Sequence, residues 1–510
     1  MSTCSRIGTV MNIRERRQIK LLTWTLDPRS QVPMYEQLCQ LLRREIQTHV
    51  LVPGKRLPSK RVLAAHLGVS SITVENAYSQ LVAEGQVETL PRRGYFVRNS
   101  FEPFDRSFLK KQAKLEKSGP LINRYKAAWQ REREVNKPGL AYDFSTNKVD
   151  TASFPFTIWA RLSRQVLQEE GRDLLEISPP QGDERLRASI ARHLQAYRGM
   201  ACDPEQIIIG AGSEYLFSLI IQLLGPGRRY AIEDPGYVKV SRILEKHKAQ
   251  ILRFEVDRHG MFIHPLELAK PDVIYLTPSH QFPTGVVMPL KRRENMLHRV
   301  NGFFDHYIIE DDYDSEFRFS GRPIPTLHSL DQQGQVIYMG TFSKSLAPSL
   351  RISYLILPPQ LLMRYRQELM FYASTVSRLE QMTLARFIDG GYFEHHLNKM
   401  RRIYRERRDA LLAAIDNWQF RSKIEINGIE TGLHLVVVFH AYVVEDALVT
   451  TASEVGISVH GLSEYRLGQT SDKLLPTLIL GYAHLTPEEL VAAADLLHQA
   501  WAGLVHGTGL

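Results

Sequence analysis

Residues 335–354 read QVIYMGTFSKSLAPSLRISY and join a short apolar run to a polar segment with one lysine and, seven positions later, one arginine. The run 335–340 is apolar and ends in glycine, which is typical of a strand buried in a sheet. Small residues flank the lysine, Lys344. Two interpretations are open at this point: Lys344 carries a cofactor, or it is one more solvent-exposed lysine at the start of a helix.

Similar apolar runs recur after residue 141 and alternate with amphipathic segments of helical length. This alternation predicts an α/β domain with a mostly parallel sheet. The six runs are QIIIGAG at 206–212, RYAIEDP at 229–235, ILRFEV at 251–256, DVIYLTP at 272–278, YIIEDDY at 307–313 and QVIYMG at 335–340.

Polar motifs follow five of these runs, where each strand would end. Ligands of such sheets bind at the carboxyl ends of the strands, so we expect the five motifs to form one shared site. The motifs are GAGSEYL at 210–216, EDPGY at 233–237, TPSHQFPTG at 277–285, EDDYDSEF at 310–317 and GTFSKS at 340–345.

The side chains in these motifs match the needs of pyridoxal 5′-phosphate (PLP). A Schiff base with PLP needs a lysine amine, and the pyridine nitrogen needs a carboxylate to stay protonated. The phosphate needs a helix N-terminus and a cation, and the ring needs an aromatic face. The candidates are Lys344 as the amine, Asp311 for the pyridine nitrogen, Tyr313 for O3′, Tyr237 for stacking, Ser213 and Arg351 for the phosphate, and Glu214 and His280 as further members of the site.

The front of the chain has a different pattern, over residues 32–98. Apolar residues recur at helical spacing in three short segments, with Ser59 as the N-cap of the second helix, Gly68 as its end, and Ser70 or Ser71 as the N-cap of the third. QVETL at 86–90 and GYFVR at 94–98 alternate as two strands of a hairpin with a basic tip. Short helices followed by a hairpin predict a winged helix-turn-helix.

Charge points to a polyanion as the partner of this front part. Residues 1–140 hold 25 Lys and Arg against 12 Asp and Glu, a net charge of +13, whereas the whole chain is +9. A solvated basic tail would also fit the charge alone, but the helix pattern and the wing favour double-stranded DNA. The candidate DNA-contacting residues are Arg61 on the second helix, Ser71, Thr73 and Asn76 on the third, and Arg92, Arg93 and Gly94 on the wing.

LPSKRVLAAHLGVSSITVENAYSQLVAEG at 57–85 resembles the GntR-family winged helix, whose pattern runs LPS-x-R-x-LA, a glycine turn, S-R-x-TV and LxxEG. The resemblance places Arg61, Thr73 and Gly94 at DNA-contacting positions. This chain has Ser71 where the family usually has arginine, which puts the usual operator sequence in doubt.

The motifs after residue 143 resemble the fold-type I aminotransferases, and together with the front part they resemble the MocR-type subfamily of GntR regulators. EDPGY, TPSHQFPTG, IEDDYDSEFR and SKSLAPSLR are close to that subfamily's versions. The resemblance implies PLP held as an internal aldimine on Lys344, and the roles given above for the other residues. It also implies a homodimer, in which the two chains could be arranged head to tail.

Two positions depart from working aminotransferases. Phe282 stands where those enzymes usually have an asparagine near O3′, and Ile479 stands where many have an arginine for the substrate α-carboxylate. An alkyl chain cannot bind a carboxylate, so we expect at most weak transaminase activity. Lys239 and Arg318 are the candidates for another effector-binding cation. Glu214 is unusual beside a phosphate, because a carboxylate there repels unless its side chain turns away.

Length and composition set the remaining expectations. A chain of 510 residues is too long for one core, so we expect a tail at 1–31, the winged helix at 32–98, a charged linker at 99–142 and the PLP-binding sensor domain at 143–510. Three cysteines without metal-ligand or pairing spacing fit the cytoplasm, and we expect no metal site and no membrane segment.

These features of the sequence are compatible with three functions. The first is a PLP-dependent transcriptional regulator that senses PLP, an amine or an amino acid and so controls DNA binding. The second is an active aminotransferase with an accessory DNA-binding domain. The third is a repressor whose large domain only dimerises. The basic front part argues against a simple enzyme, and the intact set of lysine, aspartate, tyrosine and arginine argues against a vestigial site.

Overall fold

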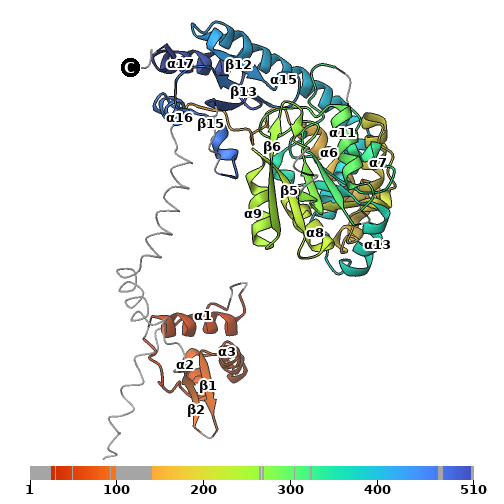
Figure 1. Cartoon of the computed structure of the whole chain (residues 1–510). Coiled ribbons are helices and arrows are strands. Elements are labelled where there is room, and N and C mark those ends of the chain that lie inside the picture. Colours follow the sequence, from red (N-terminus) through yellow and green to blue (C-terminus); the bar gives the residue numbers. More distant parts are fainter. Residues whose placement is uncertain are drawn as a thin grey trace, which may run out of the picture. The chain divides into compact units, whose positions relative to one another are not determined.

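The computed structural model of the chain describes residues 24–28, 30, 32–48, 50–91, 93–98, 140–263, 266, 269–303, 305–321, 324–468 and 475–506. The chain divides into two compact units, Met1–Lys137 and Pro138–Leu510 (Figure 1). Most of the expected tail at 1–31 and of the expected linker at 99–142 lies outside the described residues. Each unit is therefore described by itself.

The described residues of the first unit form three helices and a hairpin. The helices are α1 Met34–Gln47, α2 Lys60–Leu67 and α3 Ser71–Ala83, and the strands are β1 Val87–Leu90 and β2 Gly94–Val97. The Ser59 hydroxyl accepts the Val62 amide to cap α2, and Gly68 ends that helix in the left-handed region. Of the two serines considered for α3, Ser70 is the N-cap, because its hydroxyl accepts the Thr73 amide.

The core of this unit comes from the apolar stripes of its helices. Leu38 and Leu42 of α1 are buried together with the α3 stripe. The two strands pair antiparallel from Val87↔Val97 to Leu90↔Gly94 and form the wing. The first unit is thus a winged helix-turn-helix, as the helical spacing and the hairpin pattern predict. The α3 residues of the stripe are Val74, Ala77, Tyr78 and Leu81.

The second unit is built on an eight-stranded sheet with the order β4-β11-β10-β9-β8-β5-β6-β7. Neighbouring strands from β10 to β6 in this order run parallel, and the pairs with β11 and β7 are antiparallel. All six predicted runs are strands, and β7 and β11 are further strands that lie outside those runs. The strands are β4 Ile207–Gly210, β5 Arg229–Asp234, β6 Gln250–Asp257, β7 Gly260–Met261, β8 Val273–Leu276, β9 Tyr307–Asp312, β10 Val336–Thr341 and β11 Ser353–Ile356.

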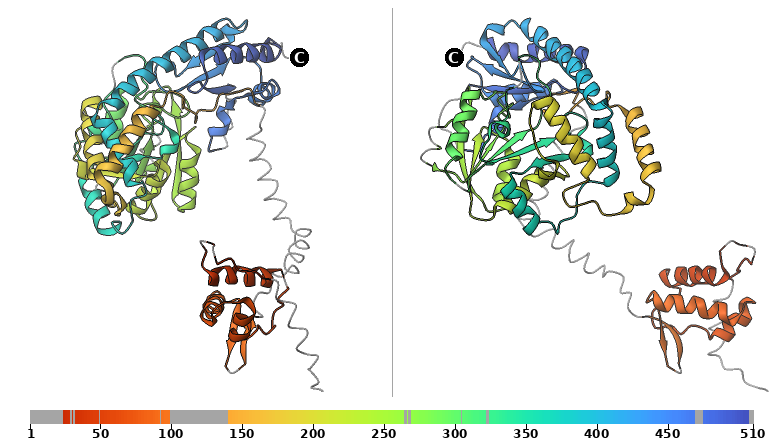
Figure 2. Two further views of the ribbon diagram at one scale, coloured as in Figure 1. Left: turned by 180° about the vertical axis from the view of Figure 1, so that it is seen from behind. Right: turned by 90° about the vertical axis from the view of Figure 1, so that its right-hand side faces the viewer.

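Helices cover both faces of this sheet, which explains why its central strands β8, β9 and β10 are almost wholly buried. Successive side chains of a strand point to opposite faces: Ile207 and Ile209 pack with α7 and α14, whereas Ile208 packs with α8, α9 and α13. Figure 2 shows helices on either side of the strands. The helices that pack on the sheet are α6 Phe156–Glu170, α7 Glu184–Arg198, α8 Ser213–Leu224, α9 Val238–Lys246, α11 Leu290–Val300, α12 Leu327–Leu330, α13 Pro359–Glu368 and α14 Arg378–Asp389.

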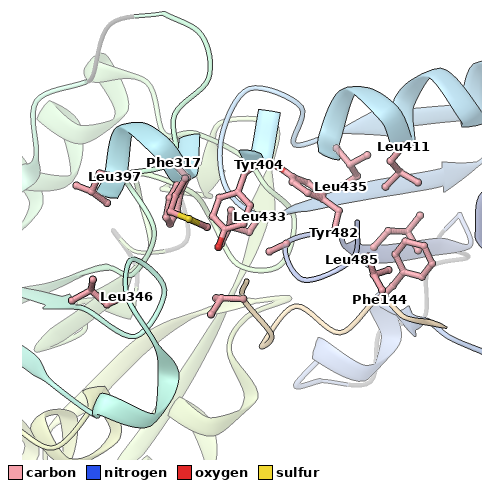
Figure 3. Close-up of a cluster of buried hydrophobic side chains, with 14 of the residues drawn as sticks. Phe144, Phe317, Leu346, Leu397, Tyr404, Leu411, Leu433, Leu435, Tyr482 and Leu485 are labelled. Carbon is pink, nitrogen blue, oxygen red and sulfur yellow. The ribbon is translucent and has the colours of Figure 1, made fainter. Parts of the chain in front are cut away.

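A smaller antiparallel sheet follows near the C-terminus, with the order β12-β13-β16-β15. Its apolar residues pack in one continuous core with those of the large sheet, and Figure 3 shows part of this junction. Its elements are α15 Tyr392–Asp416, β12 Ile424–Asn427, β13 His434–Phe439, α16 Glu445–Glu454, β15 His460–Gly461, β16 Thr477–Gly481 and α17 Pro487–His506, with the short pair β3 Tyr142–Asp143 and β14 Ile457–Ser458 beside them.

None of the helices in the described part of the chain has both the length and the apolar character needed to cross a membrane. Short 3₁₀ segments lie at Gly171–Leu175, Pro204–Gln206, Pro348–Leu350, Arg421–Lys423 and Leu462–Tyr465 in the second unit.

Candidate functional site

One cavity of about 260 Å³ lies where the predicted strand exits converge. All five polar motifs contribute side chains to its wall, because the parallel strands bring their carboxyl ends to one edge of the sheet. The expected convergence is therefore present. The lining residues are Thr146, Asn147, Ser213, Glu214, Tyr237, Lys239, Tyr275, Thr277, Phe282, Asp311, Tyr313, Asp314, Thr341, Ser343, Lys344, Pro348, Arg351, Leu433 and His434.

Lys344 follows β10 and reaches into this cavity. Its Nζ donates a hydrogen bond to the main-chain carbonyl of Thr146 at 2.5 Å. Removal from water lowers the pKa of this amine to about 8, since burial disfavours the charged form. An appreciable part of the population is therefore neutral near physiological pH, which is the form that attacks a carbonyl carbon.

Asp311 lies near the end of β9, with its carboxylate buried in the wall of the cavity. Burial raises its pKa to about 7, although the hydroxyl of Tyr275 on β8 donates a hydrogen bond to it and partly opposes the shift. A cationic partner would stabilise the charged form of a carboxylate buried in this way. The protonated ring nitrogen of a pyridine would be such a partner.

The N-terminus of α8 and Arg351 lie on another side of the cavity. Gly212 precedes this helix with a φ of +95°, and a Cβ at this position would stand 2.0 Å from Nη2 of Arg351. Only glycine therefore leaves room for the guanidinium. Ser213 begins the helix, so main-chain N–H groups and Arg351 lie together at the cavity wall.

Glu214 holds two cations at this point. Its Oε2 is 2.5 Å from Nη2 of Arg351, and its Oε1 is 3.0 Å from Nζ of Lys239. Burial raises the pKa of this carboxyl, but the hydrogen bonds from Arg351 and Lys239 lower it by more than burial raises it. The resulting pKa is about 2. Glu214 is thus a permanent anion at a place where the sequence predicts a phosphate.

Aromatic rings form a further part of the wall. Phe282 meets Tyr237 edge to face at 5.7 Å between ring centroids, and meets Tyr313 in the same way at 6.1 Å. Nζ of Lys239 lies 5.8 Å from the Tyr237 ring centroid. The cavity therefore offers ring faces and edges to a planar or cationic ligand.

His280 lies behind Tyr313 and is not among the lining residues. Its Nδ1 is 2.9 Å from the Tyr313 hydroxyl and 2.9 Å from Oδ2 of Asp314. Because a carboxylate only accepts, the Nδ1 proton is donated to Asp314. The Tyr313 hydroxyl is then free to donate its own proton into the cavity.

The two candidate effector cations lie in different places. Lys239 lines the cavity, whereas Arg318 lines a separate one of about 10 Å³ together with Arg198 and Arg293. Ile479 is fully buried in β16, where it pairs with Val436, and does not reach the cavity. Among the described lining residues, the cations are Lys239, Lys344 and Arg351.

Several lining residues were not recognised in the sequence. Tyr275 lies in the apolar run 272–278 and Asp314 in the motif 310–317, and their positions in a strand and at a strand exit could have indicated them. Thr146 and His434 carry no such signal, because they come from segments distant along the chain. The Nε2 of His434 donates to the carbonyl of Pro283 at 2.9 Å, and burial lowers the pKa of this imidazole well below its ordinary value, so the ring is neutral.

The winged helix presents several of its predicted DNA-contacting residues to solvent. Arg61, Ser71, Asn76 and Arg93 are exposed, and the guanidinium of Arg93 lies 5.8 Å from the Phe96 ring centroid. Arg92 lies outside the described residues.

Two further residues predicted to contact DNA, Thr73 and Gly94, are less exposed to solvent. Thr73 is half-buried and its hydroxyl is 2.8 Å from that of Ser70. Gly94 has a φ of +101° and lies beside the exposed Arg56, a cation that the sequence analysis did not name.

The first unit is a winged helix-turn-helix of the kind that binds DNA, and the second unit is an aminotransferase-like domain. Residues 34–97 match the family of bacterial regulatory proteins called gntR, and residues 141–495 match aminotransferase class I and II. The chain belongs to the MocR-type regulators of the GntR family.

Relatives share this arrangement over nearly their whole length. The chain is 36% identical over 482 residues to the uncharacterized HTH-type transcriptional regulator YdeL of Bacillus subtilis, covering 94% of this chain and 98% of that protein. It is 33% identical over 486 residues to the probable rhizopine catabolism regulatory protein MocR of Rhizobium meliloti, covering 94% and 96%. It is 32% identical over 453 residues to the pyridoxine biosynthesis regulator PdxR of Corynebacterium glutamicum, covering 88% and 92%.

Solved structures resemble the second unit. Kynurenine aminotransferase of Pyrococcus horikoshii has a TM-score of 0.65 at 23% identity, covering 80% of this chain and 99% of that one, and so shows the fold alone. The α-aminoadipate aminotransferase LysN of Thermus thermophilus, complexed with a phosphopyridoxyl-leucine, has a TM-score of 0.62 at 26% identity, covering 73% and 94%. The large domain therefore has the fold of the fold-type I aminotransferases, which use PLP.

Proposed function

We propose that the large domain binds PLP through Lys344 and that the bound state controls how the winged helices engage DNA. One observation carries the proposal: a lysine with a lowered pKa and a buried carboxylate face the same cavity as a helix N-terminus with an arginine. These are the three features that the aldehyde, the pyridine nitrogen and the phosphate of PLP require. The chemistry of the donor set therefore fits the cofactor.

Each residue has one task in this proposal. Lys344 holds the cofactor covalently, Asp311 binds the pyridine nitrogen, and Ser213 and Arg351 bind the phosphate. The Tyr237 ring packs on the pyridine, and the Tyr313 hydroxyl, which lies beside His280, donates to O3′. When bound, PLP supplies an aldehyde carbon that condenses with amines, and a ring that withdraws electrons.

Regulation rather than turnover follows from two features. The chain belongs to a regulator family, and Ile479 leaves the site without the arginine that commonly binds a substrate carboxylate. We propose that PLP, an amine or an amino acid binds one arrangement of the two domains more tightly than another and so shifts their populations. DNA binding and the response to the effector both take place in the cytoplasm in this proposal.

A homodimer is part of the same proposal. Helix-turn-helix proteins commonly read two half-sites as dimers. The second unit exposes large apolar residues in two segments, with Leu175 at 87% and Ile177 at 85% exposed at the end of the first 3₁₀ segment, and Phe371 at 76% after α13. Arg378, at the start of α14, donates to the carbonyl of Asp173 and so connects the first 3₁₀ segment to the helix that follows Phe371 in the chain. Exposed large apolar side chains of this kind favour self-association.

The experiment is a titration of the purified protein with PLP, followed by borohydride reduction and peptide mass spectrometry. We expect a visible absorption band and a phosphopyridoxyl mass on the peptide that contains Lys344. Lys344→Ala should lose both and should keep its affinity for nonspecific DNA. A band and a mass that persist in Lys344→Ala would contradict the cofactor assignment.

The second candidate function, an active aminotransferase, is favoured by the intact set of Lys344, Asp311 and Arg351. Incubation of the loaded protein with amino acids distinguishes the two. Stoichiometric conversion of the cofactor to its amine form followed by turnover with a keto acid would support the enzyme. A spectral change that persists without turnover would support the regulator.

A further inference from the structure

The charged groups of the cavity are already paired before any ligand is considered. Glu214 contacts Arg351 with one oxygen and Lys239 with the other. It is held in place at both ends, and its lowered pKa keeps it ionised at every pH at which the protein would work. The three anions among the described lining residues are Glu214, Asp311 and Asp314.

A cofactor phosphate would neutralise the positive charge of Arg351 and Lys239 that Glu214 leaves unbalanced. A phosphate monoester carries a charge of about −1.5 to −2 near pH 7. Added to Glu214, this exceeds the two positive charges of Arg351 and Lys239. No cation among the described lining residues is then left to bind a carboxylate, since Lys344 holds the cofactor and Ile479 is buried elsewhere.

The rest of the cavity suits a cation. Phe282, Tyr237 and Tyr313 contribute aromatic rings, and the faces of such rings attract ammonium groups. The Tyr237 ring already has the Lys239 ammonium 5.8 Å from its centroid. Asp314 is 3% exposed and adds a negative charge beside these rings.

We infer that the effector of this site is a primary amine without a carboxylate, and that Glu214 excludes carboxylated amines by holding Lys239. The inference rests on the proposed function, because the effector meets the protein only when the cofactor is bound. Lys239 is then not the carboxylate anchor that the sequence suggested. Glu214 acts as a positioning residue for specificity.

The experiment records the visible spectrum of the PLP-loaded full-length protein during titration with matched pairs of compounds. The pairs are tyramine with L-tyrosine and cadaverine with L-lysine, which differ only by the carboxylate. We expect the amine of each pair to give the half-maximal spectral change at a concentration at least about ten-fold lower, as one unpaired charge in a confined site requires.

Variants test the role of Glu214. Glu214→Gln should release Lys239, so the ratio of half-maximal concentrations between the carboxylated compound and its amine should fall at least about five-fold. In the double variant with Lys239→Ala, this ratio should return to the wild-type value. Glu205→Gln is the matched control, because Glu205 also pairs with two arginines, Arg187 and Arg366, but does not line the cavity. The control should keep the wild-type preference.

The outcomes separate the two proposals. A wild-type protein that responds equally to both members of each pair, or to neither, would overturn the inference while leaving the PLP site intact. An unchanged preference in Glu214→Gln would overturn the role of Glu214. A wild-type protein that gives no visible band on addition of PLP would instead contradict the proposed function itself.

Discussion

The Nζ of Lys344 donates a hydrogen bond to the carbonyl of Thr146 at 2.5 Å, although the two residues are 198 positions apart in the chain. Thr146 lies on the segment that follows β3, and Lys344 lies on the loop after β10. The contact places the amine inside the cavity and away from bulk water. Its lowered pKa has the same cause, the loss of solvent around the ammonium group.

Attachment of PLP should depend on pH through this amine. The pKa of Lys344 is lowered to about 8, and only the neutral amine attacks the aldehyde. Below pH 8 the rate of appearance of the visible band in stopped-flow experiments should rise about ten-fold per pH unit, and above pH 8 it should level off. A rate that continues to rise up to pH 10 would show an ordinary lysine and contradict the assignment.

Gly212→Ala should displace Arg351 from the cavity wall. The added Cβ would stand 2.0 Å from Nη2 of Arg351, so we expect the dissociation constant of PLP to rise at least about ten-fold. Fluorescence titration measures it. Gly227→Ala is the control, since Gly227 also has a positive φ, of +80°, but has no atom within 4 Å of its Cβ position. Both variants should lose similar thermal stability through backbone strain, and only the first should lose affinity.

Tyr275→Phe should weaken PLP binding through Asp311. The Tyr275 hydroxyl donates to this carboxylate and favours its charged form, so its removal should raise the pKa of Asp311 above about 7. At pH 7 fewer molecules then carry the anion that binds the pyridine nitrogen, and we expect roughly ten-fold lower affinity that recovers at higher pH. Tyr230→Phe should leave the affinity unchanged, because Tyr230 is also buried but its hydroxyl has no partner among the described residues.

Arg61→Ala should reduce the salt dependence of DNA binding. Arg61 is exposed on α2, and a phosphate contact made by one arginine contributes about one unit to the slope of log K against log salt. Electrophoretic mobility shifts at several salt concentrations measure this slope. Arg192→Ala serves as the comparison, because Arg192 is exposed in the large domain. Equal slopes for the two variants would place Arg61 away from DNA.

Phe371→Asp should weaken the proposed dimer. Phe371 is 76% exposed and its ring centroid lies 4.4 Å from that of Tyr372, and a carboxylate there would be desolvated on association. Analytical ultracentrifugation should show a larger monomer fraction at micromolar concentration. Tyr442→Asp, at an aromatic residue that is 91% exposed elsewhere in the unit, should not change the distribution. Dimers of equal stability in both variants would exclude this surface.

Much of the fold could be predicted because its signals are local. Ser59 caps α2 through the amide three residues on, and Gly68 ends the same helix, so both act within one turn. Most of the six apolar runs of the large sheet were recognisable because their strands, such as β4, β8, β9 and β10, are buried on both faces, whereas β6 is partly exposed. β11 was not predicted, although ISYLIL at 352–357 is an apolar run that ends at Pro358, and only the structure shows that this strand lies antiparallel between β4 and β10.

The sequence by itself determined the winged helix, the α/β class, the lysine and the carboxylate, since each rests on residues within a few positions of one another or at the ends of recognisable strands. Only the tertiary structure decided that Tyr275 donates to Asp311, that Thr146 meets Lys344, and that Glu214 holds two cations at once. These contacts join segments that the chain order leaves far apart. They exist because the parallel strands of the sheet end at one edge and because burial in that place makes paired charges and hydrogen bonds obligatory.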